Sequence, residues 1–524
     1  MSKRLKKIVF GISGLIIVFA IGIFTLNYYI KNKIENEIAR LSDKFKIEYK
    51  NIDVNALSGT LSFVNPLVSL YGETNQEINL QAELERFTIE DVSFWDYLFN
   101  DRIAVENIIF NKPNVTYYHN DLVKSKSYKN GLKNVSNKKI NIKSIQINNG
   151  AVKIYDVATD SIMLQSKKID FRISAVLINQ KNKKAPFSYK DFNFSTRNLY
   201  YSLNAFDNLF LEQLTANSSS TKLKGFAIKT KYKKEVLSKM LSKERDYFDL
   251  TVDSMVVKHQ DFGFQQDSIF YFKSKRVDFY NPHFDIYRDK LVTDDVTYKP
   301  LYSNMLRGLK FNLTLNEVFL NNAKIVYTEK VKEDTDGGKL EFSNFNAEIK
   351  NLSNTYKAKD TVTAIHVNAI FMKNTPLHVV WDFDVNNTTD AFLYKGELGN
   401  LEANAMNQFM EPNLNVRLKG IINKTYFTIS GNDSISQVDL KLKYDDFDVV
   451  VLKQNGKEKN KFLSSLVNLI VSKDSKKKSN SFRFGSKTGV ERDKTKSVFN
   501  YQWLNIKAGL LNAMTGNGKK NKNN

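Results

Sequence analysis

The sequence predicts a mostly β protein, in which an elongated antiparallel sheet follows one amino-terminal transmembrane helix and ends in short carboxy-terminal helices. Three observations support this fold class. The 524 residues include 37 Phe and 25 Tyr but only 7 Pro and 22 Gly, a composition typical of strands. Apolar residues alternate with period two in most segments up to Leu452. One long uncharged run, residues 8–30, lies near the amino terminus.

The amino-terminal run has the length and the flanks of a membrane anchor. Residues 1–7 form a basic leader, and the uncharged residues that follow extend about 35 Å as a helix. A cleaved signal peptide is the alternative, but its apolar region is only about 7–15 residues long. We therefore expect one bilayer crossing, with the leader in the cytoplasm and the body outside it. The anchor candidates are Ile8, Val9, Phe10, Leu15, Ile16, Ile17, Val18, Phe19, Ile21, Ile23, Phe24, Leu26, Tyr28, Tyr29 and Ile30.

A short motif recurs in the body, which we assign to residues 31–452. In "IQINNGAVKIYD", residues 145–156, two apolar alternations flank a polar Asn-Asn-Gly centre, which predicts a hairpin with its turn at that centre. The same offsets recur at 105–118, 252–264 and 315–327, without a fixed period. The paired apolar positions, which we expect to line one face of the sheet, are Ile108, Phe110, Val115, Tyr117, Ile145, Ile147, Val152, Ile154, Met255, Val257, Phe262, Phe264, Val318, Leu320, Ile325 and Tyr327.

The rest of the body also reads as strands. Helical patterns are confined to residues 33–46, 233–243 and 403–410, and we find no Pro/Gly/Ser-rich linker between compact domains. A long antiparallel sheet with one apolar face must cover that face. The cover can be a second sheet, which makes the candidate positions ordinary core, or it can be lipid acyl chains around which the sheet curls.

Positive charge is concentrated at the carboxy terminus. From residue 453 onward there are 17 Lys and Arg against 4 Asp and Glu, whereas the preceding chain carries 61 against 52. This distribution favours an anionic surface over a nucleic-acid channel, so no nucleic-acid partner is expected. Within 453–516 we expect amphipathic helices that cap the sheet, dock a partner or lie on a membrane. Their apolar stripes comprise Phe462, Leu463, Leu466, Leu469 and Ile470, and then Trp503, Leu504, Leu510 and Leu511; residues 517–524 are expected to be a disordered tail.

Catalytic and metal-binding patterns are not found in the sequence. The five histidines form no HExxH or i,i+4 pair, the chain has no cysteine, and no GxSxG, Walker or GxGxxG motif occurs. A loop at Asp334 lacks the glutamate that position 12 of an EF-hand requires. We therefore expect no catalytic residues, no metal site and no cofactor.

The chain resembles AsmA-like envelope proteins over nearly its whole length. The resemblance rests on the amino-terminal anchor followed by "IDVNALSGTLSFVNPLVSLYG", on the "IQINNGAVKIYD" and "LNEVFLNNAKIVYTE" units, and on the closing part. That closing part reads "ISQVDLKLKYDDFDVVVLK" and then "FRFGSKTGVERDKTKSVFNYQWLNIKAGLL".

The resemblance implies a fold, a location and a function. It implies a sheet folded into a taco-like groove on a protein anchored in the bacterial inner membrane, with its body in the periplasm. It also implies phospholipid binding and a role in lipid transport between membranes or in outer-membrane homeostasis. The alternative is a non-catalytic periplasmic scaffold that holds envelope assembly partners, through its sheet edges and its basic carboxy-terminal segment.

Overall fold

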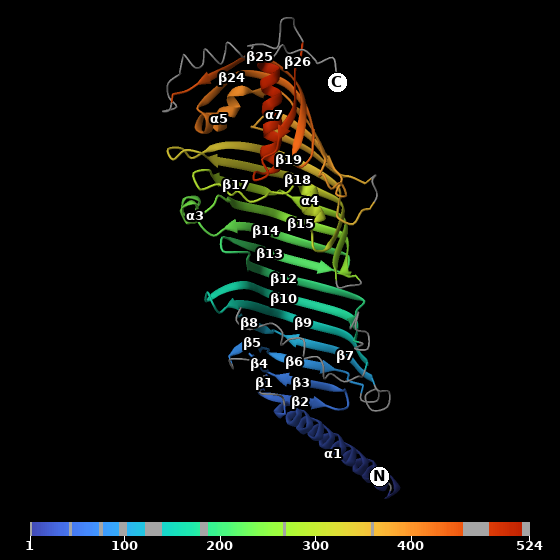
Figure 1. Cartoon of the computed structure of the whole chain (residues 1–524). Coiled ribbons are helices and arrows are strands. Elements are labelled where there is room, and N and C mark those ends of the chain that lie inside the picture. Colours follow the sequence, from blue (N-terminus) through green and yellow to red (C-terminus); the bar gives the residue numbers. More distant parts are fainter. Residues whose placement is uncertain are drawn as a thin grey trace. The chain divides into compact units, whose positions relative to one another are not determined.

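The computed structural model describes residues 3–40, 45–72, 77–93, 102–120, 139–178, 187–265, 269–357, 361–453 and 481–515, with the backbone only at 3–15, 45, 102, 139 and 187. The described chain is mostly β, as the composition predicts (Figure 1). It forms two compact units: unit 1 comprises Met1–Leu203 and Leu209–Ser218, and unit 2 comprises Asn204–Asn208 and Ser219–Asn524. The predicted helix around Phe462 and the predicted tail at 517–524 lie outside the described residues.

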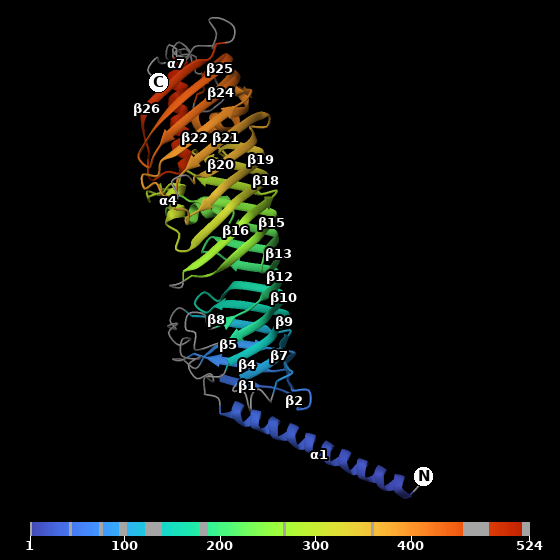
Figure 2. The ribbon, with the colours of Figure 1, turned by 90° about the vertical axis from the view of Figure 1, so that its right-hand side faces the viewer.

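Unit 1 contains one long helix and a ladder of strands. The helix α1 (Lys3–Ala39) leads away from the first two strands in Figure 2. The strands are β1 (Phe45–Glu48), β2 (Asn51–Asn55), β3 (Thr60–Val64), β4 (Leu67–Tyr71), β5 (Ile78–Glu83), β6 (Arg86–Glu90), β7 (Arg102–Asn111), β8 (Asn114–His119), β9 (Lys139–Asp156), β10 (Ser161–Ile178), β11 (Phe187–Ser188), β12 (Asp191–Ser202) and most of β13 (Asp207–Asn217).

Unit 2 continues with longer strands and short helices. Its strands are β14 (Ser220–Thr230), β15 (Asp246–Phe264), β16 (Phe270–Tyr280), β17 (His283–Asp289), β18 (Asn312–Lys330), β19 (Gly338–Ser353), β20 (Thr363–Phe371), β21 (Thr375–Phe383), β22 (Phe392–Leu398), β23 (Leu401–Glu402), β24 (Val416–Gly431), β25 (Ile435–Val451) and β26 (Arg483–Glu491). Its helices are α3 (Lys234–Met240), α4 (Tyr302–Arg307), the 3-10 turn η2 (Ala403–Met406), α5 (Asn407–Leu414) and α7 (Val498–Thr515).

The helices agree in part with the sequence patterns. The expected helices at 233–243 and 403–410 are confirmed by α3 and by η2 with α5. The expected helix at 33–46 is wrong at its end, because α1 stops at Ala39 and β1 begins at Phe45. Here the alternation of Phe45, Ile47 and Tyr49 lets the chain pair with β4, and that pairing replaces the helix. The short helix α4 was not predicted.

Most strand pairs are antiparallel, but four are parallel. In unit 1, β7 and β8 both run parallel to β9. In unit 2, β16 and β17 both run parallel to β18. A parallel return requires a long connection. The chain from β17 to β18 supplies one that contains α4, and the chain between β8 and β9 includes residues outside the described part.

The predicted hairpins are wrong, because each motif runs on in one direction. Residues 142–155 all belong to β9, 252–264 to β15 and 315–327 to β18, and 105–118 spans β7 and β8, which lie end to end beside β9. None of the four polar centres is a turn: β7 ends and β8 begins at the first, and the pairing registers shift within β9 and β18 at the second and fourth. The same position in all four motifs has a left-handed backbone: Lys112 (φ 47°), Asn149 (φ 52°), His259 (φ 51°) and Asn322 (φ 55°).

The left-handed residue explains an odd spacing in the motif. Ile147 and Val152 are five positions apart, so a regular strand would place them on opposite faces. At Asn149 the register between β9 and β10 shifts by one residue, and a Cβ at Gly150 would lie 3.0 Å from Ile147 Cγ2. Gly150, and with it Val152 and Ile154, therefore shares the face of Ile147. The bulge keeps the apolar residues together.

Backbone hydrogen bonds continue across these bulges and breaks. The Lys112 amide donates to the Asn148 carbonyl at 2.8 Å, and the Ala151 amide donates to the Pro113 carbonyl at 2.7 Å. The Asn149 amide donates to Asp170 Oδ1 at 2.8 Å. The interrupted strands therefore remain fully integrated in the sheet.

We predict that the left-handed conformation at Asn149 is required for local stability. Asn149→Val should weaken the β9–β10 pairing by about 1–2 kcal/mol, because a β-branched residue strongly disfavours this conformation, whereas Asn149→Gly should be tolerated. Hydrogen–deuterium exchange of peptides from β9 and β10 measures the change. Asn141→Val, at an exposed regular position of the same strand, is the matched control. Unchanged protection in Asn149→Val would contradict the bulge assignment.

Candidate functional site

The unit 1 candidates from the first two motifs lie side by side in the sheet. β7 and β8 pair with β9 so that each motif position meets its counterpart 37 residues later. The four cross-strand pairs are Ile108 with Ile145, Phe110 with Ile147, Val115 with Val152 and Tyr117 with Ile154. The sequence repeat is thus a repeat in space, and its members form one continuous apolar surface.

Neighbouring strands extend this surface in both directions. The row through Phe110 and Ile147 joins strands β2, β3, β6, β7, β9, β10 and β12, and its ring centroids lie 5.0 Å apart at Phe87–Phe110 and 6.4 Å apart at Phe171–Phe194. Its members are Ile52, Phe63, Phe87, Phe110, Ile147, Phe171 and Phe194. A parallel row contains Val54, Leu61, Ile89, Ile108, Ile145, Ile173 and Phe192. We call the unit 1 surface made by these two rows, with Val115, Tyr117, Val152 and Ile154, the apolar face.

The opposite side of the same strands is polar next to the Phe110 row, and it becomes apolar again at Ile142 and Val176, which are buried. The row one position away from the Phe110 row contains Asp53, Ser62, Thr88, Ile109, Gln146, Arg172 and Asn193. Ser62 and Thr88 exchange a hydroxyl hydrogen bond of 3.1 Å within this row. The two sides of the unit 1 sheet therefore differ around this row: hydroxyl, amide and charged groups predominate on one, and the apolar face on the other needs a cover.

The eight unit 1 candidates are only half-buried. Ile108, Phe110, Val115 and Tyr117 on β7 and β8 all have intermediate exposure, as do Ile145, Ile147, Val152 and Ile154 on β9. Both clusters of buried apolar side chains that the structure describes lie in unit 2. The described residues of unit 1 thus leave much of the apolar face in contact with its surroundings.

The unit 2 candidates are more varied. Val257 and Val318 are buried with Val277 in a small cluster, against which Leu320 and Phe272 pack. Met255, Phe262, Ile325 and Tyr327 have intermediate exposure, and Phe264 at the end of β15 is 73% exposed. The Tyr327 hydroxyl donates to Glu329 Oε2 at 2.8 Å, and burial raises its pKa. Residues at equivalent motif positions in unit 2 therefore differ in how deeply they are buried.

At the carboxy-terminal end of unit 2 the same kind of row is covered by protein. The row through Val318 continues across β19–β25 as Ile349, Ile365, Trp381, Tyr394, Ile429 and Val438. Ile429 and Val438 are buried in a core that also contains Leu306 of α4 and Val498, Tyr501, Ala513 and Met514 of α7. Figure 1 shows α7 in front of the last strands. The predicted carboxy-terminal cap thus exists, although Trp503 and Leu511 point outward from it.

Glycines allow α7 to lie close to the sheet. A Cβ at Gly485 of β26 would meet the Gly509 carbonyl oxygen at 2.3 Å and the Ala513 amide nitrogen at 2.4 Å. Gly509 in turn faces Leu440 of β25, with a Cβ contact of 3.0 Å. Close backbone approach makes this end of unit 2 a packed core with no space for a ligand chain between the helix and these strands.

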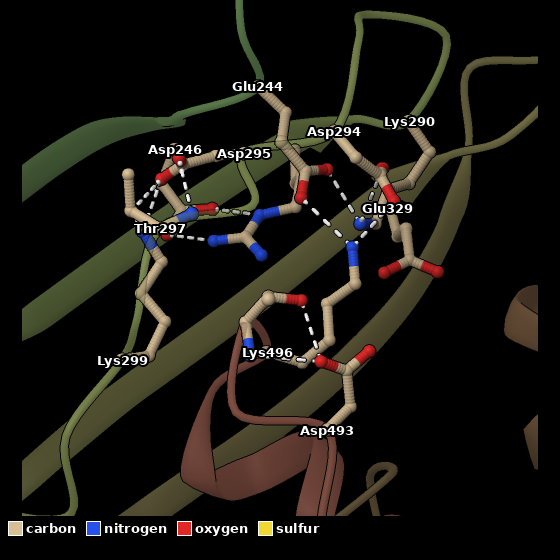
Figure 3. Close-up of polar contacts among 12 residues, drawn as sticks. Glu244, Asp246, Lys290, Asp294, Asp295, Thr297, Lys299, Glu329, Asp493 and Lys496 are labelled. Atoms are coloured by element: carbon tan, nitrogen blue, oxygen red, sulfur yellow. Dashed lines mark hydrogen bonds and ion pairs between the residues drawn. The ribbon is translucent and has the colours of Figure 1, made fainter.

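An ionic cluster fixes the start of α7 (Figure 3). The Glu244 side chain, 4% exposed, accepts a 2.6 Å hydrogen bond from Lys290 Nζ and lies 3.5 Å from Lys496 Nζ. Lys496 also donates to Asp294 Oδ2 at 2.8 Å. The hydrogen bond from Lys496 holds the pKa of the Asp294 carboxyl below its usual value, and the same bond raises the pKa of Lys496.

The cluster consists of ion pairs that link elements of unit 2 and stabilise its fold. Arg288 forms two hydrogen bonds with Asp246, at 2.6 and 2.7 Å, and Arg492 bonds to Asp433 and to the Lys299 carbonyl. Each described cation named here has a carboxylate partner, so the cluster does not form an anion-binding site. Across the described residues, no group of three or more His, Asp or Glu is arranged to hold a metal ion.

The helix α1 has a largely exposed apolar surface. Nine large apolar side chains from Ile16 to Tyr29 are between 49% and 74% exposed. The second half of the helix contacts the sheet region, where Asn27 Oδ1 accepts the Ala56 amide at 2.7 Å and Lys31 Nζ donates to Asn51 Oδ1 at 3.0 Å. No helix within the described part of the chain combines the length and the apolar character needed to cross a bilayer. The side chains of Ile8, Val9, Phe10 and Leu15 lie outside that part.

No protein-family model matches the chain, and no curated protein matches it.

Sequence reasoning found one half of the apolar face and missed the other. Phe63, Phe87, Phe171 and Phe194 complete the row of Phe110 but belong to no recurring motif. Their signal was present in the alternation of "TLSFV", "RFTIE" and "DFRIS", which marks strands but not their neighbours. The ionic cluster had no sequence signal, because its members lie up to 252 positions apart.

We predict a specific pH dependence for the contribution of Lys496. Lys496→Met should lower the thermal midpoint of unit 2 by about 2–4 °C near neutral pH, since the substitution removes a partly exposed ion pair. The folded pKa of Asp294 is below its ordinary 3.8, so the stabilisation is present above 3.8 and is lost as the pH falls through the folded value. The folded pKa of Lys496 is above 10.5, so the stabilisation is complete below 10.5 and is lost as the pH rises through the folded value.

Calorimetry of the wild type and Lys496→Met across the pH range tests this dependence. The difference between their midpoints should be largest near neutral pH and should shrink at both extremes. Lys487→Met, at an exposed lysine of β26, is the control and should show little difference at any pH. A constant difference for Lys496→Met would show that its ion pairs do not contribute.

Proposed function

We propose that this protein is a membrane-anchored envelope protein that binds phospholipid acyl chains on the apolar face and supports lipid transport between membranes or outer-membrane homeostasis. In this proposal it is not an enzyme and uses no cofactor. The apolar face of unit 1 carries the proposal: two continuous rows of apolar side chains, most of them half-buried, beside which the other side of the sheet has a mainly polar row.

Acyl chains have the chemistry and the shape to cover such a face. Contact with an acyl chain buries methylene groups, each of which contributes about 0.8 kcal/mol. The rows run across strands, from β2 to β12, so a chain lying along a row meets apolar side chains at each strand spacing of about 4.8 Å. A headgroup stays in water while the chain slides from one strand to the next. Acyl chains thus match a face that is linear, apolar and free of directional polar groups.

The amino-terminal helix supports the membrane part of the proposal. Its exposed apolar surface between Ile16 and Tyr29 needs a cover, and residues 8–30 contain no charge. In this proposal the segment inserts in the bacterial inner membrane, with residues 1–7 in the cytoplasm and the body in the periplasm. The location rests on the resemblance to AsmA-like proteins, as does the taco-like curl of the sheet.

A second function is favoured by unit 2. The alternative, a periplasmic scaffold for envelope assembly partners, predicts an interior filled by side chains. The core beneath α7 has this character, since Ile429 and Val438 are 0% and 1% exposed. The two functions therefore make different predictions for unit 1. Lipid transport predicts that acyl chains cover the apolar face, whereas the scaffold function predicts that a protein partner covers it.

We predict that Phe110→Glu will weaken phospholipid binding while Ile109→Glu will not. Phe110 lies in the centre of the apolar row, and Ile109, its chain neighbour with similar exposure, lies in the polar row on the opposite side. Losing two or three methylene contacts should reduce affinity by more than about tenfold. Mass spectrometry of lipids bound to the purified full chain, with titration of a fluorescent phospholipid, measures the effect.

Photocrosslinking tests the same face inside cells. A photoreactive amino acid at position 110 or 147 should capture phospholipid, whereas one at 109 or 146 should not. A wild-type chain that purifies without lipid and crosslinks none from positions 110 and 147 would reject the proposal. Crosslinks from these positions to one protein partner instead would support the scaffold function.

A further inference from the structure

Unit 2 exposes an unusual group of apolar side chains where α4 meets α7. Phe499, Trp503 and Leu511 of α7 are 63%, 43% and 52% exposed, and Tyr302 and Met305 of α4 are 37% and 52% exposed. The rings of Tyr302 and Phe499 are in edge contact, with centroids 6.5 Å apart. We call these five residues the C-terminal patch. Contiguous exposed apolar surface of this kind usually marks a site of interaction.

The patch is separate from the buried face of the same helix. Tyr501, Ala513 and Met514 pack into the core of unit 2, whereas Phe499, Trp503 and Leu511 recur at intervals of four and eight residues on the outward side. The ionic cluster at Lys496 and the close contact at Gly485 already fix α7 on the sheet. Apart from the ring contact of Phe499 with Tyr302, no packing contact explains the apolar character of these outward residues among the described interactions.

We propose that the C-terminal patch docks on the surface of an anionic lipid bilayer. Aromatic side chains with a lysine among them suit the membrane–water interface, where rings reach the acyl boundary and the amine reaches headgroups. Lys507 lies one turn after Trp503 and one turn before Leu511 and is exposed. The chain on both sides of this part of the protein is basic, with 17 Lys and Arg against 4 Asp and Glu from residue 453 to the end. This charge selects an anionic surface over a neutral one.

Docking is independent of lipid binding on the apolar face. The patch lies on helices of unit 2, and the apolar face lies on strands of unit 1. A membrane-docked patch places the carboxy-terminal end of the protein against a bilayer whether or not the sheet carries acyl chains. The two proposals can therefore fail separately.

Tryptophan fluorescence provides a direct test with the full chain. The three tryptophans are Trp95, Trp381 and Trp503, and α1 contains none, so insertion of α1 does not contribute to the signal. With Trp95→Phe as the background, Trp381 stays buried and Trp503 reports on the patch. Vesicles of phosphatidylcholine with phosphatidylglycerol, carrying brominated acyl chains, should quench this fluorescence, and Trp503→Phe should remove most of the quenching.

Substitutions in the patch distinguish docking from simple charge attraction. Phe499→Ser with Leu511→Ser should reduce the quenching of Trp503 by the anionic vesicles by about tenfold or more, because the apolar contact is lost, and Lys507→Glu should also reduce it. The matched control is Leu57→Ser with Val157→Ser, at two exposed apolar positions of unit 1, which should bind like the background. Lipid copurifying with the apolar face should be unchanged in all these variants.

Several results would overturn the proposal. If the patch substitutions do not reduce the quenching by anionic vesicles, the contact with these vesicles would be assigned to the basic segments alone. Equal quenching by pure phosphatidylcholine vesicles would remove the anionic requirement. Quenching that is undiminished in Trp503→Phe would place the contact elsewhere; a small residual from Trp381, whose ring lies 5.2 Å from that of Tyr302, is consistent with docking. A stable dimer in native mass spectrometry that Phe499→Ser with Leu511→Ser dissociates would assign the patch to a second copy of the chain.

Discussion

The sheet depends on single left-handed residues placed near the middle of its strands. In each recurring motif the apolar pairs are separated by an odd number of positions, which a regular strand cannot keep on one face. Lys112, Asn149, His259 and Asn322 resolve this conflict at the same motif position. Asparagine is well suited to the role, since it tolerates the left-handed region and its side chain bonds locally. Without these bulges, each strand would present half of its apolar residues to the polar side.

Once the apolar residues share a face, the cover of that face determines the character of each unit. At the end of unit 2 the cover is α7, drawn close by Gly485 and Gly509, and the result is a dry core around Tyr444 and Tyr501. In unit 1 the described residues leave Ile108 and Ile147 half-exposed. A similar row of side chains thus yields a protein core in one place and an open apolar surface in another. Only the second can accept a ligand without displacing packed protein.

This difference also marks the limit of prediction from the sequence. Period-two alternation located most strands, and the recurring motif identified residues that meet in register, such as Phe110 and Ile147. The same motif led to hairpins, because Asn-Asn-Gly chemistry suits a turn and a bulge equally well. The parallel pairing of β7 with β9 and the ion pairs around Glu244 both join residues that are far apart in the chain. Neither can therefore be read from a local sequence pattern. Val318 is buried among residues of neighbouring strands, such as Val257 and Val277, whereas Tyr117 has intermediate exposure, and the motif itself does not distinguish the two.

The two exposed helical surfaces differ in a way that separates their roles. The surface of α1 from Ile16 to Tyr29 is apolar on all sides and lies within an uncharged stretch, which suits hydrocarbon, where a charge is costly. The outward side of α7 places Lys507 between Trp503 and Leu511, and its other side is committed to the core. A helix of that kind cannot enter a bilayer without unfolding its unit, but it can rest on one. The two surfaces therefore require different covers: that of α1 is uncharged from Ile16 to Tyr29, whereas that of α7 has a charge at its centre.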